Sequence, residues 1–362
     1  MHEKKLSRLL SLDVFRGLTI ALMIIVNSPG NQTPYPILKH AEWSGCSLAD
    51  LVFPFFIFIV GVSTVFSLAK ARSSEKKLLM KILARSLIIF FIGLALNAFP
   101  SHFNLNSIRL FGVLQRIAIC YFFSAILFLK TKVKTQIFIL AALLCSYWML
   151  MNLPSFDLSA QGNFAAYIDQ IFFSSAHLYG KFYDPEGLLS TIPAIATVIL
   201  GNFTGIWLVS NVKPPLKRDG MILLGFTALI AGWVWSMWFP LNKALWTSSY
   251  VLFTGGLAIL TLALLYWLIE LKGWLKWSKP FEIFGLNALA AYVLHVLFLK
   301  LQMIVIISSQ NGVSLNLKSF LTYNLFGWAS LENAALFYAL SYCLFWLFVF
   351  TIFYRKRIFI KI

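Results

Sequence analysis

The residues of this sequence that could do chemistry are ionisable and amide side chains at the ends of long apolar runs. His40 and Asp50 flank the start of one such run, in the segment KHAEWSGCSLADLVFPFF. Ionisable groups in apolar surroundings are costly, and they usually face a cavity or a partner. A plainer interpretation of Asp50 stays open, because the helix dipole alone favours an acidic residue in a first turn.

Arginines form a second group of candidates. Asp13 and Arg16 are three residues apart and share one helix face, where they could form a structural ion pair. Arg85 lies within another apolar run. Arg109 and Arg116 are seven residues apart on one face, with no acid in that run, which favours anions or carbonyl groups as their partners. The alternative is that these arginines hold neighbouring helices together.

The remaining candidates are polar residues whose structural explanation is equally simple. Asp184 and Glu186 lie in the turn sequence YDPEG, which could be a solvated turn. A lone histidine in an apolar run is more often hydrogen-bonded filler than a catalyst. His295 is such a histidine. The other members of this group are Asn27, Asn242, Lys243 and Asn287.

Composition identifies the elements that must position these residues. The chain has 60% hydrophobic and 12% charged residues, too few polar groups to coat a soluble globule of 362 residues. A membrane-spanning helix needs roughly 20 mostly apolar residues. We expect an all-α membrane protein with about ten such helices, at 12–28, 47–69, 78–98, 108–129, 133–152, 188–210, 219–239, 245–271, 280–308 and 333–354.

The distribution of basic residues predicts the orientation. Of the 30 Lys and Arg residues, 21 lie in alternate loops, at 1–8, 70–81, 130–134, 213–218, 272–279 and 355–361. The positive-inside rule then places both termini in the cytoplasm. The same alternation argues against a nucleic-acid partner, despite the net charge of +17.

We expect one membrane domain over residues 1–362, because no linker or internal repeat divides the chain. The four cysteines are scattered, so no disulfide framework is predicted. No HExxH motif or Cys/His cluster suggests a metal. Three long segments are expected on the outer side, namely 29–46, 153–187 and 309–332.

Five sequence segments together resemble one enzyme family. They are SLDVFRGLTIALMIIVN, the KHAEW to DLVFPFF segment, FGVLQRIAICYF, YDPEGLLSTIPAI and PLNKALWTSSY. In order and content they resemble the heparan-alpha-glucosaminide N-acetyltransferase family of transmembrane acyltransferases. The likeness runs from about Ser11 to His295, without the amino-terminal lumenal domain of the lysosomal animal enzymes. We therefore expect a bacterial relative in the cytoplasmic (inner) membrane.

The resemblance implies acetyl-CoA as the cytosolic donor and an amino-sugar or glycan acceptor on the far side. It also implies that His40 is the catalytic histidine, with Asn27 as its polar companion. We expect Asp50 or Asp184 to orient His40, and Asn27 or Arg109 to stabilise an oxyanion. The remaining predicted contacts are Arg16, Arg85, Arg109 and Arg116 for the cofactor, and Asp184, Glu186, Asn242, Lys243, Asn287 and His295 for the acceptor.

Histidine suits proton abstraction from an amine, because its ordinary pKa of about 6.5 lies near neutrality. Covalent catalysis, in which His40 carries the acetyl group, stays open. So do two other functions, a transporter or flippase and an O-acyltransferase that acts on a polysaccharide. Other expected partners are membrane lipid and, as an open alternative to a monomer, a second copy of the chain.

Overall fold

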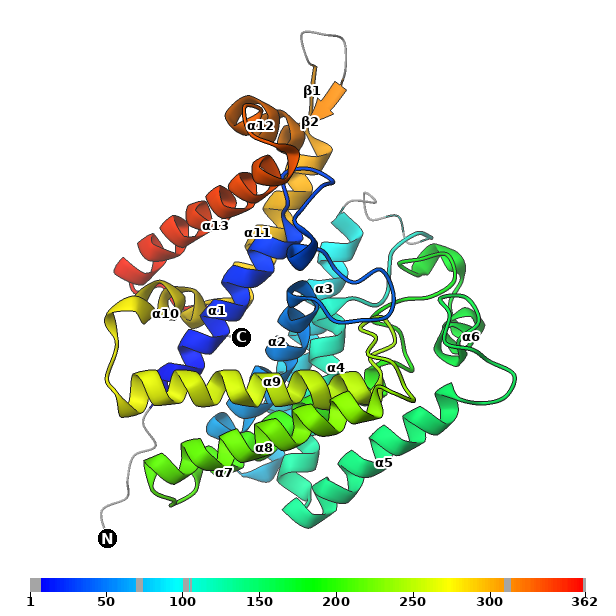
Figure 1. Ribbon diagram of the computed structural model, residues 1–362, viewed down its shortest axis with the longest axis vertical. Coiled ribbons are helices and arrows are strands. Elements are labelled where there is room, and N and C mark those ends of the chain that lie inside the picture. Colours follow the sequence, from blue (N-terminus) through cyan, green and yellow to red (C-terminus); the bar gives the residue numbers. More distant parts are fainter. Residues whose placement is uncertain (1–7, 70–73, 100–103, 105, 309–313, 361–362) are drawn as a thin grey trace.

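The computed structural model describes residues 8–69, 74–99, 104, 106–308 and 314–360. Part of the topology prediction depends on basic residues outside these ranges, namely Lys4, Lys5, Lys70, Arg72 and Lys361. Helices form nearly all of the regular structure (Figure 1), and the prediction of an all-α polytopic membrane protein is confirmed.

Among the described residues, eight helical segments are long and apolar enough to cross a membrane. In chain order these are α1 (Leu10–Asn27), α2 (Leu48–Leu68), α3 (Glu75–Ala98), α4 (Val113–Lys130), α5 (Val133–Met151), α7 (Thr191–Val209), α9 (Ser248–Tyr266) with its π-helical continuation η4 (Trp267–Leu271), and α13 (Leu331–Arg355). They coincide with eight of the ten expected spans.

The other two expected spans differ from the prediction. The run 280–308 is not one continuous helix, because α10 (Lys279–Leu286) and α11 (Ala288–Ile304) meet at Asn287 with a bend of 74°. The run 219–239 corresponds to α8 (Pro214–Trp235), whose early turns carry the charged residues Lys217, Arg218 and Asp219. These charges keep α8 out of the group of strongly apolar helices, although it packs along the length of α9 (Figure 1).

Most of the shorter elements lie in or beside the three long segments expected on the outer side, 29–46, 153–187 and 309–332. They are η1 (Pro36–Leu38), α6 (Phe164–Phe172), η3 (Ser175–His177), β1 (Ile306–Ser308), β2 (Ser314–Asn316) and α12 (Leu317–Phe326), with η5 (Lys276–Ser278) before α10. The antiparallel hairpin β1–β2 pairs Ile306 with Asn316 and was not predicted. Two strands of three residues leave no sequence pattern long enough to separate from the end of a helix.

Close backbone contacts hold the centre of the molecule together. A Cβ atom on Gly17 of α1 would lie 1.7 Å from the Phe281 carbonyl oxygen of α10, so only glycine fits at this crossing. Gly201, in the sequence GNFTG, likewise faces the Phe58 carbonyl oxygen of α2, where a Cβ would be 2.1 Å away. GNFTG is therefore a packing motif, as small residues at this spacing indicate.

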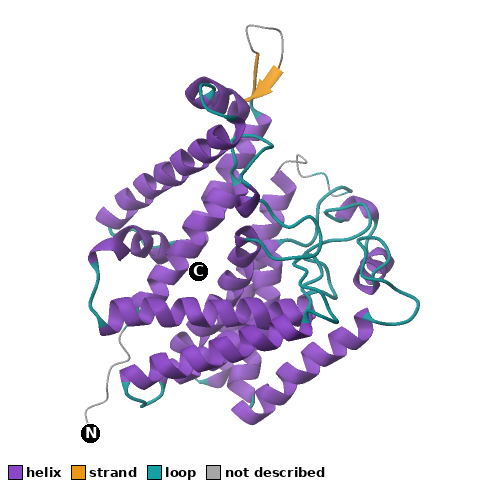
Figure 2. Ribbon diagram, viewed as in Figure 1, coloured by secondary structure: helices purple, strands orange, loops and turns teal. Residues whose placement is uncertain are grey.

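Loops gather on one side of the molecule, beside α6 (Figure 2). They come from segments that are far apart in the chain: the one after α1, the one around α6 and the one between α8 and α9. The polar residues of the candidate site lie where these loops meet the start of α2.

Candidate active site

Three loops are tied to one another above the N-terminal end of α2. The Trp43 indole Nε1 donates a hydrogen bond to the Leu158 carbonyl at 2.8 Å, and its ring contacts Tyr183 edge-on at 5.3 Å. The Gly45 amide donates to the Leu241 carbonyl at 2.7 Å. Gly45 has a φ of +122°, a conformation that side chains rarely adopt, so a glycine is needed at this turn.

Asp50 begins α2 and organises the chain around it. Its Oδ2 accepts hydrogen bonds from the Ser47 amide at 3.1 Å and from the Ala41 amide at 3.0 Å. Together with Ser47 it forms a capping box, which satisfies amide groups that a helix start leaves without partners. The carboxylate therefore has a structural role, and its Oδ1 atom is still available for another contact.

That second contact is with His40. The His40 Nδ1 atom lies 2.8 Å from Asp50 Oδ1, while the imidazole is 43% exposed and the carboxylate only 1%. A buried carboxylate bound to one ring nitrogen orients the imidazole. The other ring nitrogen, Nε2, is left without a carboxylate partner. The prediction that Asp50 lies beside His40 thus agrees with the geometry, and Asp184 makes a different set of contacts.

Lys243 completes this cluster from the loop between α8 and α9. Its Nζ lies 3.1 Å from His40 Nδ1 and 3.5 Å from both His40 Nε2 and Asp50 Oδ1. Burial lowers the pKa of Lys243, whereas the negative charges of Asp50 and Glu186 act to raise it. The ammonium group therefore contacts the Asp50 carboxylate and the imidazole, and it also experiences the negative charge of Glu186.

Aromatic residues of α2, of α9 and of the loop before α9 pack beside the cluster. The Tyr250 hydroxyl of α9 donates to the Asp50 carbonyl at 2.6 Å, and the Trp246 ring packs edge-on against Tyr250 and Phe53. Trp246 has a φ of +53°, which is uncommon for a large side chain. The backbone amide of Trp246 donates to the Lys243 carbonyl, so this turn also places Lys243.

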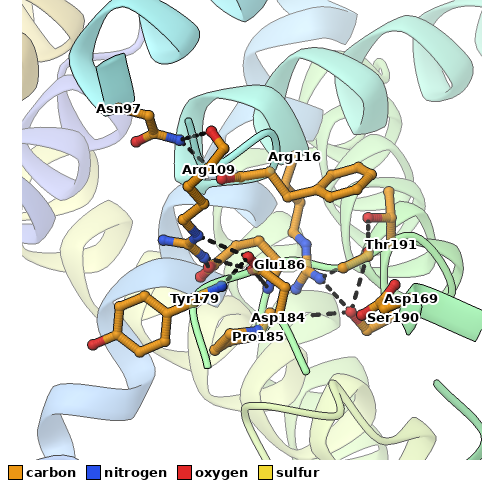
Figure 3. Close-up of polar contacts among 12 residues, drawn as sticks. Asn97, Arg109, Arg116, Asp169, Tyr179, Asp184, Pro185, Glu186, Ser190 and Thr191 are labelled. Atoms are coloured by element: carbon orange, nitrogen blue, oxygen red, sulfur yellow. Dashed lines mark hydrogen bonds and ion pairs between the residues drawn. The ribbon is translucent and has the colours of Figure 1, made fainter. Parts of the chain in front are cut away.

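Arg109 lies in the loop before α4, where it binds both acids of the YDPEG turn (Figure 3). Its Nε donates to Asp184 Oδ2 at 2.8 Å, and its Nη2 contacts Glu186. Burial lowers the pKa of Arg109, but the two carboxylates more than offset this, so the pKa lies above its ordinary value. Asn97 of α3 holds the Arg109 carbonyl at 3.0 Å.

Arg116 is fully buried one turn inside α4, and its guanidinium lies over the Trp246 ring at 5.0 Å. Its Nη2 donates to Ser190 and, at 3.4 Å, to the Gly187 carbonyl. Its Nε and Nη1 have no hydrogen-bond partner among the described residues. The expected common helix face is wrong, because α4 begins only at Val113 and Arg109 precedes it. Both arginines nevertheless bind the YDPEG turn, and neither lines the cofactor cavity.

Asp169 was missed by the sequence analysis. It lies on α6, is 2% exposed, and its Oδ1 accepts a hydrogen bond from the Leu188 amide at 3.0 Å. Burial raises the pKa of Asp169 to about 6. Its only sequence signal was an acid in the short apolar stretch FAAYIDQIF, which a surface helix explains equally well.

A cavity of about 560 Å³ opens among α1, α2, α3 and α4 on the side of the chain termini. Its cationic lining comes from Arg8, Arg16 and Arg85, with Asp13 as the acid between the first two. The other lining residues are largely apolar, namely Phe56, Ile59, Val60, Ser63, Thr64, Ile89, Ile117, Tyr121, Gly285, Leu286, Ala288, Leu289, Phe359 and Ile360. The volume is within the range of ligand sites, about 300–1,000 Å³.

Of the four arginines predicted for the cofactor, two line this cavity. Arg16 donates to Asp13 at 3.0 Å, to the Gly285 carbonyl at 3.2 Å and to Ser63 Oγ at 2.7 Å. The Arg85 guanidinium lies over the Tyr121 ring at 5.1 Å. With three cations and one acid, the cavity favours an anionic ligand, and Arg85 has donors free of a carboxylate.

Four other predicted residues lie apart from His40. Asn27 is the last residue of α1 and is exposed. Asn242 is buried, with its Oδ1 holding the Leu245 amide at 2.8 Å. Asn287 holds the C-terminal segment through Ile358 and Ile360, and His295 is buried with its Nδ1 2.8 Å from the Ala291 carbonyl.

Comparison with known proteins identifies the family. Residues 8–231 match the family model described as heparan-alpha-glucosaminide N-acetyltransferase, catalytic. The chain belongs to this family. The matched range contains His40, Asp50 and every arginine that lines the cavity, and the resemblance inferred from the five sequence segments is confirmed.

Two curated relatives carry the name heparan-alpha-glucosaminide N-acetyltransferase. The protein of Mus musculus is 31% identical and that of Homo sapiens 30% identical, in both cases over 80% of this chain. Each alignment covers 53% of the relative. The chain thus spans about half the length of the curated relatives it matches.

Proposed function

We propose that this member of the family is a transmembrane N-acetyltransferase. It transfers the acetyl group of acetyl-CoA to the amino group of a glucosamine-like sugar. The observation that carries the proposal is the pair of His40 and Asp50, in which a half-exposed imidazole is held at 2.8 Å by a buried carboxylate. Family membership and the cation-lined cavity support the same reaction.

His40 acts as the base of this reaction. With a proton on Nδ1 donated to Asp50, the Nε2 lone pair accepts a proton from the acceptor amine as the nitrogen attacks the acetyl carbonyl. The tetrahedral adduct then collapses, the carbon–sulfur bond breaks, and the departing thiolate takes the proton from Nε2, which returns His40 to its neutral form. In the covalent variant, Nε2 itself takes the acetyl group and passes it to the amine.

The cavity is the proposed donor site. Acetyl-CoA supplies the activated acetyl group, and Arg8, Arg16 and Arg85 would bind its phosphates through charge-assisted hydrogen bonds. The apolar residues on α2 and α4 would contact the rest of the molecule. Phe56 is the cavity residue of α2 nearest to Asp50 in sequence, and six residues of helix span roughly 9 Å. The cavity therefore begins roughly 9 Å along α2 from Asp50 of the catalytic pair.

The loop face is the proposed acceptor site. Lys243 contacts His40 there, Glu186 contributes a negative charge that acts on Lys243, and Arg109 and Asp184 hold the YDPEG turn in place. A carboxylate on this loop face is suited to bind the hydroxyl or ammonium groups of a sugar. Asn242 positions Lys243 by bracing its turn, whereas Asn287 and His295 lie in the α10–α11 region and are not part of this proposed contact set.

The proposed orientation follows from the charges. With both termini in the cytoplasm, the cavity faces the cytosolic pool of acetyl-CoA and the loops face the opposite side, as the alternation of basic loops favours. A bacterial cytoplasmic membrane is the proposed location of this single acyltransferase domain. Membrane lipid surrounds the long apolar helices.

The decisive experiment measures CoA release by the purified protein in detergent. Glucosamine and other amine-bearing sugars should be acetylated, whereas sugars with hydroxyl groups alone should not. Acetylation of hydroxyl-only sugars at an equal rate would support the O-acyltransferase instead. If no acceptor supports turnover while labelled sugar crosses proteoliposome membranes, the protein is a carrier and the proposed chemistry is wrong.

A further inference from the structure

The most informative contact outside the expected chemistry is that of Lys243 with the imidazole of His40. The Lys243 Nζ approaches both ring nitrogens, at 3.1 Å from Nδ1 and 3.5 Å from Nε2. The same atom is 3.5 Å from Asp50 Oδ1. An ammonium group so close to a base influences whether that base carries a proton.

Asp50 by itself favours a second proton on the His40 ring. A carboxylate that is 1% exposed and 2.8 Å from an imidazole nitrogen favours the positively charged imidazolium form. An imidazolium has no lone pair and cannot accept a proton from an amine. A positive charge beside the ring opposes this second proton and so favours the neutral form, which can act as a base.

We propose that Lys243 is a positioning residue whose positive charge keeps His40 neutral, with its proton on Nδ1 and its Nε2 lone pair free. The inference deepens the proposed function and rests on His40 as the base. Lys243 repels a second proton on the ring, while Asp50 accepts the first one. The two charges thus act on the imidazole in opposite directions.

The tautomer follows from the same contacts. With hydrogen on Nδ1, the ring donates to Asp50 Oδ1 at 2.8 Å. With hydrogen on Nε2 instead, the Nδ1 lone pair would face the carboxylate at that distance, an unfavourable arrangement. Lys243 also approaches Nδ1, but its shared contact with Asp50 Oδ1 gives its ammonium group an acceptor.

The surrounding charges keep Lys243 in place. Glu186, from the loop before α7, acts on Lys243 together with Asp50, and Arg109 in turn binds Glu186. The other titratable groups facing the cluster are Cys46 from the same loop as His40 and Tyr250 from α9. Lys39 and Glu42 pair with each other at the surface, at 3.8 Å. Among the described residues, Lys243 is the cation in contact with the ring.

The test reads the charge of His40 without requiring turnover. Diethyl pyrocarbonate modifies neutral imidazole, so the pH midpoint of His40 modification, followed by peptide mass spectrometry in the full-length protein, reports its titration. Lys243→Met should raise this midpoint by roughly one pH unit or more, because the opposing charge is lost. Lys243→Arg keeps the charge and should stay within a few tenths of a unit of the parent protein.

Two comparisons make the result specific. Asp50→Asn, which keeps a capping side chain, should move the midpoint to lower pH. His177 serves as the internal control, since its Nδ1 contacts the Ile108 carbonyl at 2.7 Å, and its midpoint should be the same in every variant. An unchanged or lowered His40 midpoint in Lys243→Met would overturn the inference, as would an equal rise in Lys243→Arg.

The acetyltransferase assay separates this inference from the proposed function. If both hold, the acidic limb of the kcat/KM profile in Lys243→Met moves to higher pH together with the modification midpoint. A shifted midpoint in a protein that never acetylates a sugar would refute the proposed function and leave the charge effect standing. A higher KM for the acceptor with an unshifted midpoint would assign Lys243 to sugar binding and refute the inference.

Discussion

At the scale of single residues, one carboxylate serves both structure and chemistry. The Oδ2 atom of Asp50 binds the amides that start α2, and its Oδ1 atom binds His40. The two interpretations left open for Asp50, a first-turn residue and a partner of the histidine, are therefore compatible. The orientation of His40 depends on the same interactions that begin the helix.

The role of His40 leads to the first prediction. His40→Ala should reduce acetyl transfer by about 10²–10⁴-fold, the usual contribution of general acid–base catalysis. Binding of acetyl-CoA should be largely unchanged, because His40 does not line the cavity. Steady-state kinetics and calorimetric titration measure the two effects. His177→Ala, in a separate loop, is the control, and full activity in folded His40→Ala would exclude a direct role.

The second prediction concerns the donor cavity. Arg85→Ala should weaken acetyl-CoA binding by on the order of 1.5–3 kcal/mol, because a charge-assisted phosphate contact is lost. Arg85 is the cleaner choice, since Arg16 also binds Gly285 and Ser63 of the scaffold. Arg218→Ala removes the same charge at the start of α8, outside the cavity, and should leave the Kd unchanged. Equal affinity in Arg85→Ala would place the phosphates elsewhere.

Buried Asp169 leads to the third prediction, a pH-dependent stability. Burial raises its pKa to about 6 in the folded protein, so the folded state binds the proton more tightly than the unfolded chain. This contribution is fully present below about pH 4 and is lost as pH rises through 6. Asp169→Asn removes the titration and should gain up to roughly 3 kcal/mol relative to the parent between pH 4 and pH 7.5.

Thermal unfolding of both proteins at pH 5 and pH 7.5 measures this difference. The stability advantage of Asp169→Asn should be larger at pH 7.5. Glu42→Gln, which changes an exposed carboxylate, provides a control with little pH dependence. A constant difference at both pH values would show that Asp169 does not titrate in this range.

At the scale of elements, glycines decide which helices can cross at the backbone. Gly17 of α1 meets the Phe281 carbonyl of α10, and Gly285 of α10 meets the Asp13 carbonyl of α1. This reciprocal crossing lies beside Asp13 and Arg16, which line the cavity. The bend at Asn287 brings α10 against α1 there, so the helix break shapes the donor site.

The fourth prediction tests this crossing. Gly17→Ala should destabilise the protein by about 1–3 kcal/mol or more, since its Cβ would overlap a carbonyl oxygen that cannot move without its helix. Gly255→Ala on α9 is the matched control, because its Cβ would meet only the Leu200 side chain. Detergent thermal-shift measurements should give a lower Tm for Gly17→Ala alone. Similar Tm values in both variants would contradict the close α1–α10 contact.

At the scale of the whole molecule, the two sites lie at different levels along α2. The cavity contains residues from the middle and later turns of α2, together with residues near both ends of the chain, and the His40 cluster lies at its beginning. The proposed reaction therefore joins a donor on one side of the membrane to an acceptor on the other. Its geometry requires the predicted orientation of the chain.

The fifth prediction is that orientation. In a background without native cysteines, single cysteines at Lys132 and Lys276 should be labelled only from the cytoplasm. Cysteines at Thr33 and Ser155 should react with an impermeant reagent from outside, because the loops that follow α1 and α5 belong to the opposite face. Labelling of Ser155 and Lys276 from one side would refute the proposed topology.

The sequence by itself determined that lipid surrounds the apolar helices, and it also determined the class of fold and the family. Apolar runs of membrane length identified the helices, since that signal lies within each segment. The segment from Lys39 to Phe56 carried much of the family resemblance, and it also contained the histidine and carboxylate that lie together. Their proximity was foreseeable because only ten residues separate them in the chain.

Only the tertiary structure decided which distant residues join them. Lys243 reaches His40 across 203 positions, and Arg109 binds Asp184 across 75. For the same reason, Arg16 and Arg85 lie at the cavity, whereas Arg109 and Arg116 lie at the YDPEG turn. A periodic pattern shows which face of a helix a side chain occupies, but not which other helix or loop packs against that face. That choice depends on packing of the whole chain, where small residues such as Gly17 let particular helices approach.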